Sequence, residues 1–243
     1  MKTVFTKTPS LKDTQSHYCP GCGHGIAHRL LAEAIDELGI RDRTIGIAPV
    51  GCAVLAYNYL DIDMIEVAHG RAPAVATGMK RTNPDKIIFS YQGDGDLAAI
   101  GTAEILHAGH RAEQITVIFI NNAVFGMTGG QMAPTTVLNQ VTATTPKGRA
   151  ADQGYPLQIS EIMALLPGVA YVERCSLSNP AQIVNAKRAV KHAFDLQIKG
   201  AKGLGLVEIL SPCPTYWHLS PAKAMEWIDK EMTKDFPLGR LKG

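Results

Sequence analysis

The sequence has no apolar run long enough to cross a bilayer, and its first 17 residues lack the apolar core of a signal peptide. These absences favour a cytoplasmic protein, in which the five cysteines are expected to act as ligands or free thiols rather than as disulfides. No basic block disturbs the balance of 24 Lys and Arg against 22 Asp and Glu. Neither nucleic acid nor a membrane surface is therefore an expected partner.

Two phosphate-binding motifs are also missing. The chain contains no G-x-x-x-x-G-K-[ST] loop, and no G-x-G-x-x-G follows a predicted strand. This argues against a nucleotide-binding or scaffold subunit that uses its loops for ATP and magnesium. No internal repeat, low-complexity segment or linker divides the 243 residues, so residues 1–243 are predicted to form one α/β domain with an N-terminal cysteine knuckle and a C-terminal extension.

Apolar runs and helical periodicity predict the secondary structure. Strands are expected over residues 44–50, 64–68, 87–91, 115–120, 169–174 and 204–210. Helices are expected over residues 25–38, 72–82, 97–110, 180–199 and 221–232. Residues 1–18 are expected to cross the surface or a neighbouring subunit, and the chain is expected to end in a polar tail.

The most informative stretch lies between residues 86 and 131. Two buried-strand patterns, 87–91 and 115–120, flank a helical pattern over 97–110, and each predicted strand ends in a polar loop. In such a β-α-β unit the strands are parallel and the crossover is right-handed. Both loops therefore emerge at the carboxyl edge of one sheet, where α/β proteins bind ligands.

The residues of these loops suit a metal-bound phosphate. Gly93 and Gly95 allow a sharp turn and a close approach to a ligand. Asp94 and Asn122 offer hard oxygens, which suit Mg²⁺ together with a nearby backbone carbonyl and phosphate oxygens. The predicted helix would direct its N-terminus at that phosphate, and the glycine-rich segment 126–130 adds backbone N–H groups. The alternative is a pair of ordinary loops with turn-forming residues.

Four of the five cysteines lie in predicted loops. Cys19 and Cys22 form a C-x-x-C knuckle with Pro and Gly between them, and Cys52 and Cys213 each follow a predicted strand. Four converging thiolates would select zinc or an iron–sulfur cluster, and the spacing does not decide between them. A thioredoxin-like pair would need a strand before the knuckle, and a further alternative is that only the knuckle is functional. Cys175 has no companion.

A segment without usable periodicity covers residues 128–157. A loop of this length in a compact domain is usually functional or covered by a partner. Its two cations, Lys147 and Arg149, are candidates for anion or subunit contacts, but we expect them to be solvated surface charges.

A family resemblance rests on the order of six motifs. Gly-Asp-Gly followed by Asn-Asn resembles the thiamine-diphosphate signature. Over residues 18–216 the chain resembles the β subunit of 2-oxoacid:ferredoxin oxidoreductases, through the ordered motifs CPGCGH, PVGC, AHGRAPAVATG, GDGD, NN-x-V-F-G-M-T-G-G-Q and SPCPT. The resemblance implies a thiamine-diphosphate-binding α/β fold with a mostly parallel central sheet and helices on both faces.

The resemblance also implies three sets of site residues. The Mg²⁺ ligands would be Asp94, the Asn122 side chain and the Val124 carbonyl. The residues along thiamine diphosphate would be Gly51, Cys52, His69, Asp94, Gly95, Asp96, Asn122, Gly126, Met127 and Thr128, with His69 near the diphosphate or else structural. The ligands of a [4Fe–4S] cluster beside the thiazolium ring would be Cys19, Cys22, Cys52 and Cys213, which leaves Cys175 as a structural thiol.

The reaction implied is that of the family: a 2-oxoacid, coenzyme A and oxidised ferredoxin give acyl-CoA, CO₂ and reduced ferredoxin. In this family the glutamate that activates thiamine belongs to an α subunit, and nothing marks such a residue here, since Glu66 and Glu104 fit ordinary strand and helix positions. The chain alone is therefore expected to be inactive. Its partners would be the α subunit, γ, δ or ferredoxin-like subunits, and ferredoxin.

The substrate is suggested by a single position. Three residues after Cys52, family members that act on acidic oxoacids can carry a lysine, and here that residue is Leu55. This favours a branched or neutral 2-oxoacid such as 2-oxoisovalerate, with 2-oxoglutarate as the rival. The alternative function is that of a non-redox thiamine-diphosphate decarboxylase subunit with a structural zinc.

Overall fold

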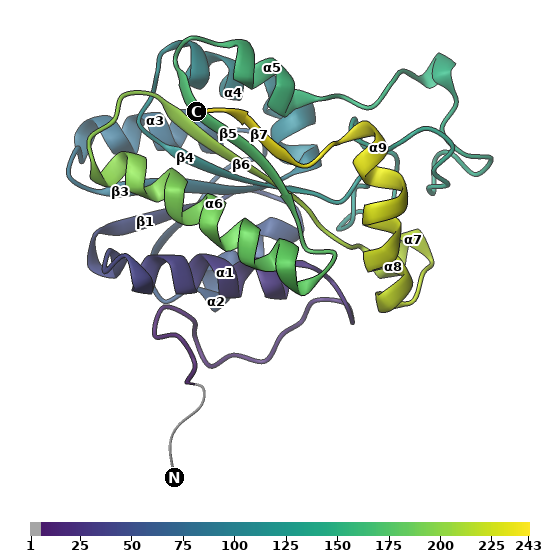
Figure 1. The fold of residues 1–243 in the computed structure, drawn as a ribbon, viewed down its shortest axis with the longest axis horizontal. Helices are drawn as coiled ribbons and strands as arrows, with labels where there is room; N and C mark the ends of the chain where they lie inside the picture. Colours follow the sequence, from purple (N-terminus) through teal and green to yellow (C-terminus); the bar gives the residue numbers. More distant parts are fainter. Residues whose placement is uncertain (1–5) are drawn as a thin grey trace.

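The fold is built on one seven-stranded sheet. The computed structural model describes residues 6–243, and its strands follow the order β2-β1-β3-β4-β6-β5-β7 (Figure 1). The strands are β1 (Thr44–Ala48), β2 (Asp63–Glu66), β3 (Ile87–Gly93), β4 (Thr116–Asn121), β5 (Val169–Ser176), β6 (Leu204–Leu210) and β7 (Gly239–Lys242). Pairs among β1 to β6 are parallel, and β7 runs antiparallel to β5 at the edge.

Helices connect and cover these strands. The α-helices are α1 (His24–Glu37), α2 (Ala56–Tyr59), α3 (Ala72–Thr82), α4 (Thr102–His110), α5 (Ile159–Leu165), α6 (Pro180–Ile198), α7 (Pro214–Trp217), α8 (Pro221–Trp227) and α9 (Thr233–Asp235). Short 3₁₀ turns form η1 (Arg41–Arg43), η2 (Cys52–Leu55) and η4 (Ala151–Gln153), and π-helical turns form η3 (Asp96–Ile100) and η5 (Ile228–Met232). Among the described residues, no helix is long and apolar enough to span a membrane.

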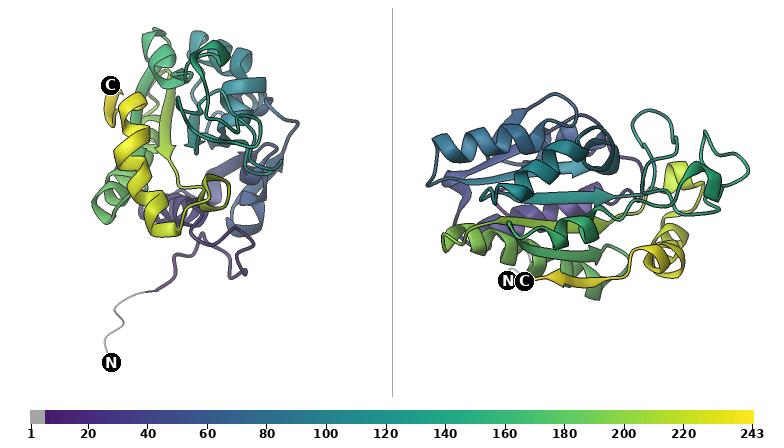
Figure 2. Two further views of the ribbon diagram at one scale, coloured as in Figure 1. Left: turned by 90° about the vertical axis from the view of Figure 1, so that its right-hand side faces the viewer. Right: turned by 90° about the horizontal axis from the view of Figure 1, so that it is seen from above.

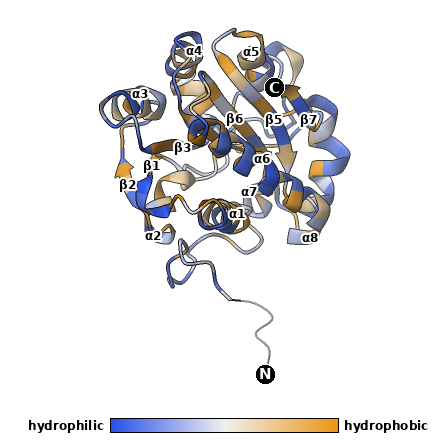
Figure 3. Ribbon diagram, turned by 60° about the vertical axis from the view of Figure 1, so that its left-hand side comes forward, coloured by the Kyte–Doolittle hydropathy of each residue, from blue (hydrophilic) through white to orange (hydrophobic). Residues whose placement is uncertain are grey.

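The sheet is buried on both faces, as the apolar runs predict. Helices cover both faces of the sheet (Figures 2 and 3). One core joins α1 and α6 to Ile87 and Phe89 of β3, and the other joins α3, α4 and α5 to Ile88, which lies between them. This alternation follows from the two-residue period of a strand. The predicted fold, a mostly parallel sheet with helices on both faces, is confirmed.

The prediction for the central β-α-β unit needs two corrections. Strand β3 continues through Gly93, because its ladder with β4 extends to a pairing of Gly93 with Ile120. The predicted helix over 97–110 is also not continuous. It begins as the π-helical turn η3, in which the Gly101 N–H donates to the Asp96 carbonyl at 2.9 Å, and becomes α-helical at Thr102.

The C-terminal prediction was wrong at the last residues. The expected polar tail ends in β7, whose Arg240 lies over the Tyr171 ring and whose Lys242 donates to the Leu166 carbonyl at 2.6 Å. An edge strand with half-exposed, charged residues has no apolar alternation, so its sequence pattern does not predict a strand. Helix α5 was not predicted, and the helix expected over 221–232 continues through η5 and α9.

The N-terminal segment can be compared with its prediction only from residue 6, because residues 1–5 lie outside the described part of the chain. It runs across the outside of α1 and α2, as expected for a surface segment. Ser10 donates through its backbone N–H to Asp36 at 3.0 Å, and Lys12 donates through its N–H to the Tyr59 carbonyl at 2.7 Å.

The topology places a crevice at the carboxyl edge of β1 and β3. These strands are neighbours, but the chain leaves β1 toward the face covered by α1 and α6, and leaves β3 toward the face covered by α3 and α4. Open α/β sheets bind ligands where neighbouring connections diverge in this way. Segment 128–157 and helices α7 to α9 extend from this same end of the sheet (Figure 1).

Candidate functional site

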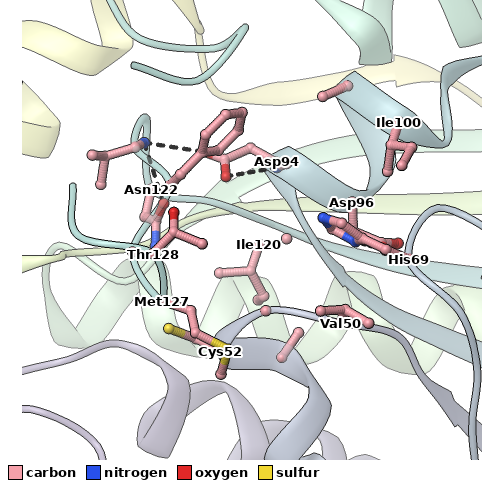
Figure 4. A pocket seen from close by; sticks show the side chains of 18 of the residues that line it. Val50, Cys52, His69, Asp94, Asp96, Ile100, Ile120, Asn122, Met127 and Thr128 are labelled. Atoms are coloured by element: carbon pink, nitrogen blue, oxygen red, sulfur yellow. Dashed lines mark hydrogen bonds and ion pairs between the residues drawn. The ribbon is translucent and has the colours of Figure 1, made fainter. Parts of the chain in front are cut away.

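A pocket of about 270 Å³ occupies this crevice. It is lined by segments that follow four neighbouring strands, together with His24 of α1 (Figure 4). The ten residues expected along thiamine diphosphate all line it, as does Val124, although they come from four separate loops. The parallel sheet thus brings the predicted residues together in one place.

Asp94 lies buried at the base of the pocket. Its Oδ1 accepts a hydrogen bond from the Gly95 N–H at 2.9 Å, and its Oδ2 accepts from the Val124 N–H at 3.2 Å and the Thr135 hydroxyl at 2.9 Å. Burial raises the pKa of Asp94 to about 7, although these hydrogen bonds act in the opposite direction. A buried carboxylate with a raised pKa at the base of a pocket suits a bound cation.

Asn122 completes an oxygen-rich group with Asp94 and Val124. One terminal amide atom of Asn122 lies 2.7 Å from the Val124 carbonyl oxygen and 3.2 Å from Asp94 Oδ2. If that atom is nitrogen, it donates to both oxygens. If it is oxygen, its distances to these two oxygens are close to the spacing of neighbouring ligands around octahedral Mg²⁺, which is about 3 Å.

The sharp turn predicted for Gly93 and Gly95 was wrong. Neither residue adopts a left-handed conformation; Gly93 ends β3, and Gly95 has helical angles with φ −64°. A Cβ on Gly95 would lie 2.9 Å from the Phe125 ring. Gly95 therefore permits close packing between the loops after β3 and β4 rather than a sharp turn. The left-handed glycine of the pocket is Gly51, with φ +104°.

His69 and Asp96 form a pair on another wall of the pocket (Figure 4). His69 Nδ1 lies 2.6 Å from Asp96 Oδ1, which also accepts from the Gly70 N–H at 2.6 Å, and Gln92 donates to Asp96 Oδ2 at 2.5 Å. The Asp96 carboxylate is thus occupied by protein donors. It links the loop after β2 to the start of η3, while the half-exposed His69 remains accessible from the pocket.

The cysteines of the predicted cluster line a second cavity of about 180 Å³. Its cysteines are Cys19, Cys22, Cys52 and Cys213. A Cβ on Gly126 would lie 3.4 Å from Cys52 Sγ and 3.9 Å from Cys213 Sγ, so a bare glycine backbone faces these two sulfurs. Within residues 6–243, no three His, Cys, Asp or Glu side chains are gathered closely enough to hold a single metal ion.

Burial keeps three of these thiols, those of Cys22, Cys52 and Cys213, protonated in the absence of a cation. It raises the pKa of Cys22 to about 11 and that of Cys213 to about 12, and it also raises the pKa of Cys52. Cys175 lies elsewhere, buried in the core beside α6. The thioredoxin-like alternative lacks its strand, since the described residues before Cys19 contain only the isolated bridge from Leu11 to Leu60.

The two cavities share a wall made by His24, Cys52, Asn122, Gly126 and Met127. His24 was not identified from the sequence, although it ends the CPGCGH motif. Its Nδ1 lies 2.7 Å from the Tyr91 hydroxyl, and burial lowers its pKa to about 4, so the ring is neutral at neutral pH. The dividing wall therefore carries no histidine charge.

Arg149 is not the surface charge that we expected. Its side chain is buried, and it donates to the backbone carbonyls of Pro134 at 2.9 Å, Thr136, and Tyr155 at 3.0 Å. Lys147, two residues earlier, is exposed as predicted. The sequence could not show which of these two cations is buried, because the carbonyl groups gather around Arg149 only when the segment folds.

The mostly parallel sheet with a pocket at its carboxyl edge defines a ligand-binding α/β protein, and the family comparison assigns it to the thiamine-diphosphate enzymes. The family described as "Thiamine pyrophosphate enzyme, C-terminal TPP binding domain" matches residues 49–208. The chain is 38% identical to the 2-oxoglutarate synthase subunit KorB of Methanocaldococcus jannaschii, over 82% of this chain and 70% of that protein. The chain therefore belongs to the family of 2-oxoacid:ferredoxin oxidoreductase subunits.

Two further comparisons agree with this family. The ketoisovalerate oxidoreductase subunit VorA of Methanothermobacter thermautotrophicus is 50% identical over 97% of this chain, but the match covers 49% of VorA. The chain thus spans about half the length of that relative. The structure of "2-oxoglutarate:ferredoxin oxidoreductase from Magnetococcus marinus with 2-oxoglutarate, coenzyme A and succinyl-CoA bound" matches with a TM-score of 0.74 and 28% identity, over 88% of this chain and 69% of that one.

Proposed function

We propose that this chain is the thiamine-diphosphate- and cluster-binding β subunit of a 2-oxoacid:ferredoxin oxidoreductase. The complex would decarboxylate a 2-oxoacid oxidatively, transfer the acyl group to coenzyme A, and pass the electrons through a [4Fe–4S] cluster to ferredoxin. The observation that carries this proposal is the shared wall, because it sets the oxygen-lined pocket directly beside the cavity of the four cysteines.

The donor set at the first cavity fits magnesium diphosphate. Asp94, Asn122 and the Val124 carbonyl would hold Mg²⁺, because the Asn122 amide lies beside a carboxylate oxygen and a carbonyl oxygen, the ligands that this cation prefers. The N-terminal turn of η3 faces the same pocket and would favour a phosphate there. Backbone N–H groups of the segment from Gly126 to Thr128 border the pocket from the opposite loop.

The second cavity fits a cluster better than a single zinc ion. Zinc needs its sulfurs about 2.3 Å from one point. The four thiols instead surround a cavity of about 180 Å³, and no three metal-binding side chains of the described residues converge on one point. Burial raises the pKa values of Cys22, Cys52 and Cys213, so metal binding in this cavity must displace protons from these thiols.

Each part of this chain has a limited task in the mechanism. When bound, thiamine diphosphate supplies the electron sink for decarboxylation, and a [4Fe–4S] cluster accepts electrons one at a time. The protein positions these groups, and the apolar Val50, Ile100 and Met127 form half-exposed walls that limit water in the pocket. Neutral His24 separates the cavities without adding a charge between them.

The chain lacks one catalytic group. No glutamate among the described residues lines the pocket, which supports the proposal that a partner α subunit supplies the carboxylate that activates thiamine. Additional γ, δ or ferredoxin-like subunits would complete the complex, with ferredoxin as electron acceptor and the cytoplasm as its location. Purified chain alone should show no oxidoreductase activity, whereas the assembled complex should.

We propose 2-oxoisovalerate as the substrate, with 2-oxoglutarate as the rival. Leu55 lines the cysteine cavity and offers no charge for a distal carboxylate. The chain is also 50% identical to ketoisovalerate oxidoreductase subunits and 38% identical to a 2-oxoglutarate synthase subunit. In the complex, the Leu55→Lys variant should shift the ratio of kcat/KM values about tenfold toward 2-oxoglutarate. An unchanged ratio would remove Leu55 from the specificity argument.

Anaerobic purification tests the class of enzyme. The wild-type chain should be brown, with about four irons and four sulfides per chain, and the complex should retain thiamine diphosphate. Cys213→Ala should lose most of this iron, whereas Cys175→Ala, the matched control from the core, should keep it. A colourless protein with one zinc per chain would overturn the redox proposal and favour the non-redox decarboxylase subunit.

A further inference from the structure

One side chain of segment 128–157, that of Thr135, reaches the proposed metal site. The Thr135 hydroxyl donates to Asp94 Oδ2 at 2.9 Å, and Thr135 is fully buried. The backbone N–H groups of Gly95 and Val124 also donate to this carboxylate, and the Asn122 amide does so when its nitrogen faces Asp94. A residue 41 positions away in the chain thus orients the side chain at the base of the pocket.

Arg149 holds the turn that carries Thr135. Its Nη1 donates to the carbonyls of Pro134 at 2.9 Å and Thr136, which are the two residues on either side of Thr135. The guanidinium is buried and bound to carbonyl oxygens, so it fixes the turn from inside the segment. A hydroxyl on a mobile loop would not keep one orientation. The Thr135 hydroxyl does, because Arg149 binds the carbonyls of the residues before and after it.

We propose that Thr135, held in place by Arg149, is a positioning residue for Asp94. Its hydrogen bond would set the orientation of the carboxylate that receives the cation of the bound diphosphate, and this inference rests on the proposed function. Outer hydrogen bonds to metal-binding carboxylates orient them, and their loss typically lowers metal affinity by about 10- to 100-fold. Segment 128–157 thereby acquires a task at the site, in addition to covering it.

Thr136 supplies a matched control. It is also fully buried, and its hydroxyl accepts from the Ala133 N–H at 2.9 Å and donates to the Ala123 carbonyl at 2.7 Å. Like Thr135, it is buried and hydrogen-bonded through its hydroxyl, but its two hydroxyl contacts do not reach Asp94. A general loss of packing should affect both threonines, whereas a role at the carboxylate should affect only Thr135.

The test measures the Mg²⁺ concentration that gives half-maximal binding of thiamine diphosphate to the chelator-treated complex, by calorimetry. Thr135→Val should raise that concentration about 10- to 100-fold. Thr135→Ser, which restores the hydroxyl, and Thr136→Val should stay within about threefold of the wild type. Equal effects of Thr135→Val and Thr136→Val, or no effect of Thr135→Val, would overturn the inference.

A second variant covers the case in which Thr135→Val does not fold. Arg149→Lys should raise the same Mg²⁺ concentration. The double variant Arg149→Lys/Thr135→Ser should not raise it by more than the range predicted for Thr135→Val. An unchanged value for Arg149→Lys would overturn the part assigned to Arg149. A wild-type complex that binds no thiamine diphosphate with Mg²⁺ would instead overturn the proposed function itself, so the two failures are distinguishable.

Discussion

The indole N–H of Trp217 donates a hydrogen bond to the backbone carbonyl of Asn122 at 3.0 Å. Trp217 ends α7, the helix that begins directly after Cys213, so this bond joins the loop of the last cysteine to the loop after β4. The proposed cluster site and the proposed metal site are therefore connected through a single side chain as well as through their shared wall.

This bond predicts a fluorescent signal of binding. The chain has two tryptophans, Trp217 and Trp227. Mg²⁺ with thiamine diphosphate should change the emission of the Trp227→Phe variant, which retains Trp217, but not that of Trp217→Phe. Fluorescence titration of the two variants checks this. An equal change in both would show that the signal does not come from the Asn122 loop.

The buried ion pairs of Arg174 predict a large loss of stability. Arg174 is fully buried and donates to Glu208 at 2.7 Å and to Glu161 at 2.6 and 2.7 Å. Arg174→Met leaves the Glu208 charge buried without its partner, so the free energy of unfolding should fall by about 3–5 kcal/mol. Denaturant titration measures it.

The matched control for that variant lies on the surface. Lys191 pairs with Glu37 at 2.7 Å between α6 and α1, where both side chains are substantially exposed. Lys191→Met should change the free energy of unfolding by less than about 1 kcal/mol. Similar losses in the two variants would contradict the distinction between buried and exposed pairs.

Two glycines should respond to alanine with opposite sign. A Cβ on Gly168 would lie 2.2 Å from the backbone oxygen of Gly109, so Gly168→Ala should destabilise the protein by about 1–3 kcal/mol. Gly78 is exposed within α3 and has no atoms within 4 Å of a Cβ, so Gly78→Ala should stabilise it by about 0.5–1 kcal/mol. Melting temperatures of both variants test this, and a shift of the same sign in both would refute it.

Buried His28 predicts a loss of stability in acid. Burial holds its pKa well below 6.5, with the nearby His24 acting in the same direction, and its Nε2 has no hydrogen-bond partner. Below about pH 6.5 the unfolded chain binds a proton at this histidine that the folded chain does not, so the free energy of unfolding decreases as the pH falls. The slope should be up to about 1.4 kcal/mol per pH unit.

A substitution isolates that slope. His28→Gln should lose less stability between pH 6.5 and pH 5 than the wild type, because it removes the titrating ring. His110→Gln, which changes an exposed histidine, should keep the wild-type slope. Denaturant titrations at several pH values measure the slopes, and identical slopes for His28→Gln and the wild type would exclude this residue as the cause.

Strong local patterns were sufficient for most of the fold. The apolar runs predicted β6 and the periodic pattern predicted α3 with the observed bounds, because buried strands and amphipathic helices leave clear periods. The edge strand β7 and the π-helical start at Asp96 were missed. Their conformations depend on pairing with β5 and on contact with Gly70, neither of which is written in neighbouring residues.

The sequence by itself determined the family and the parallel sheet, and it proposed the oxygen and sulfur donors, because all of these depend on residue types in a fixed order. Only the tertiary structure decided that Thr135 reaches Asp94, that Arg149 is buried, and that His24 stands between the two cavities. Those relationships join segments far apart in the chain. They arise from how the loops pack at the carboxyl edge, and local periodicity does not encode that packing.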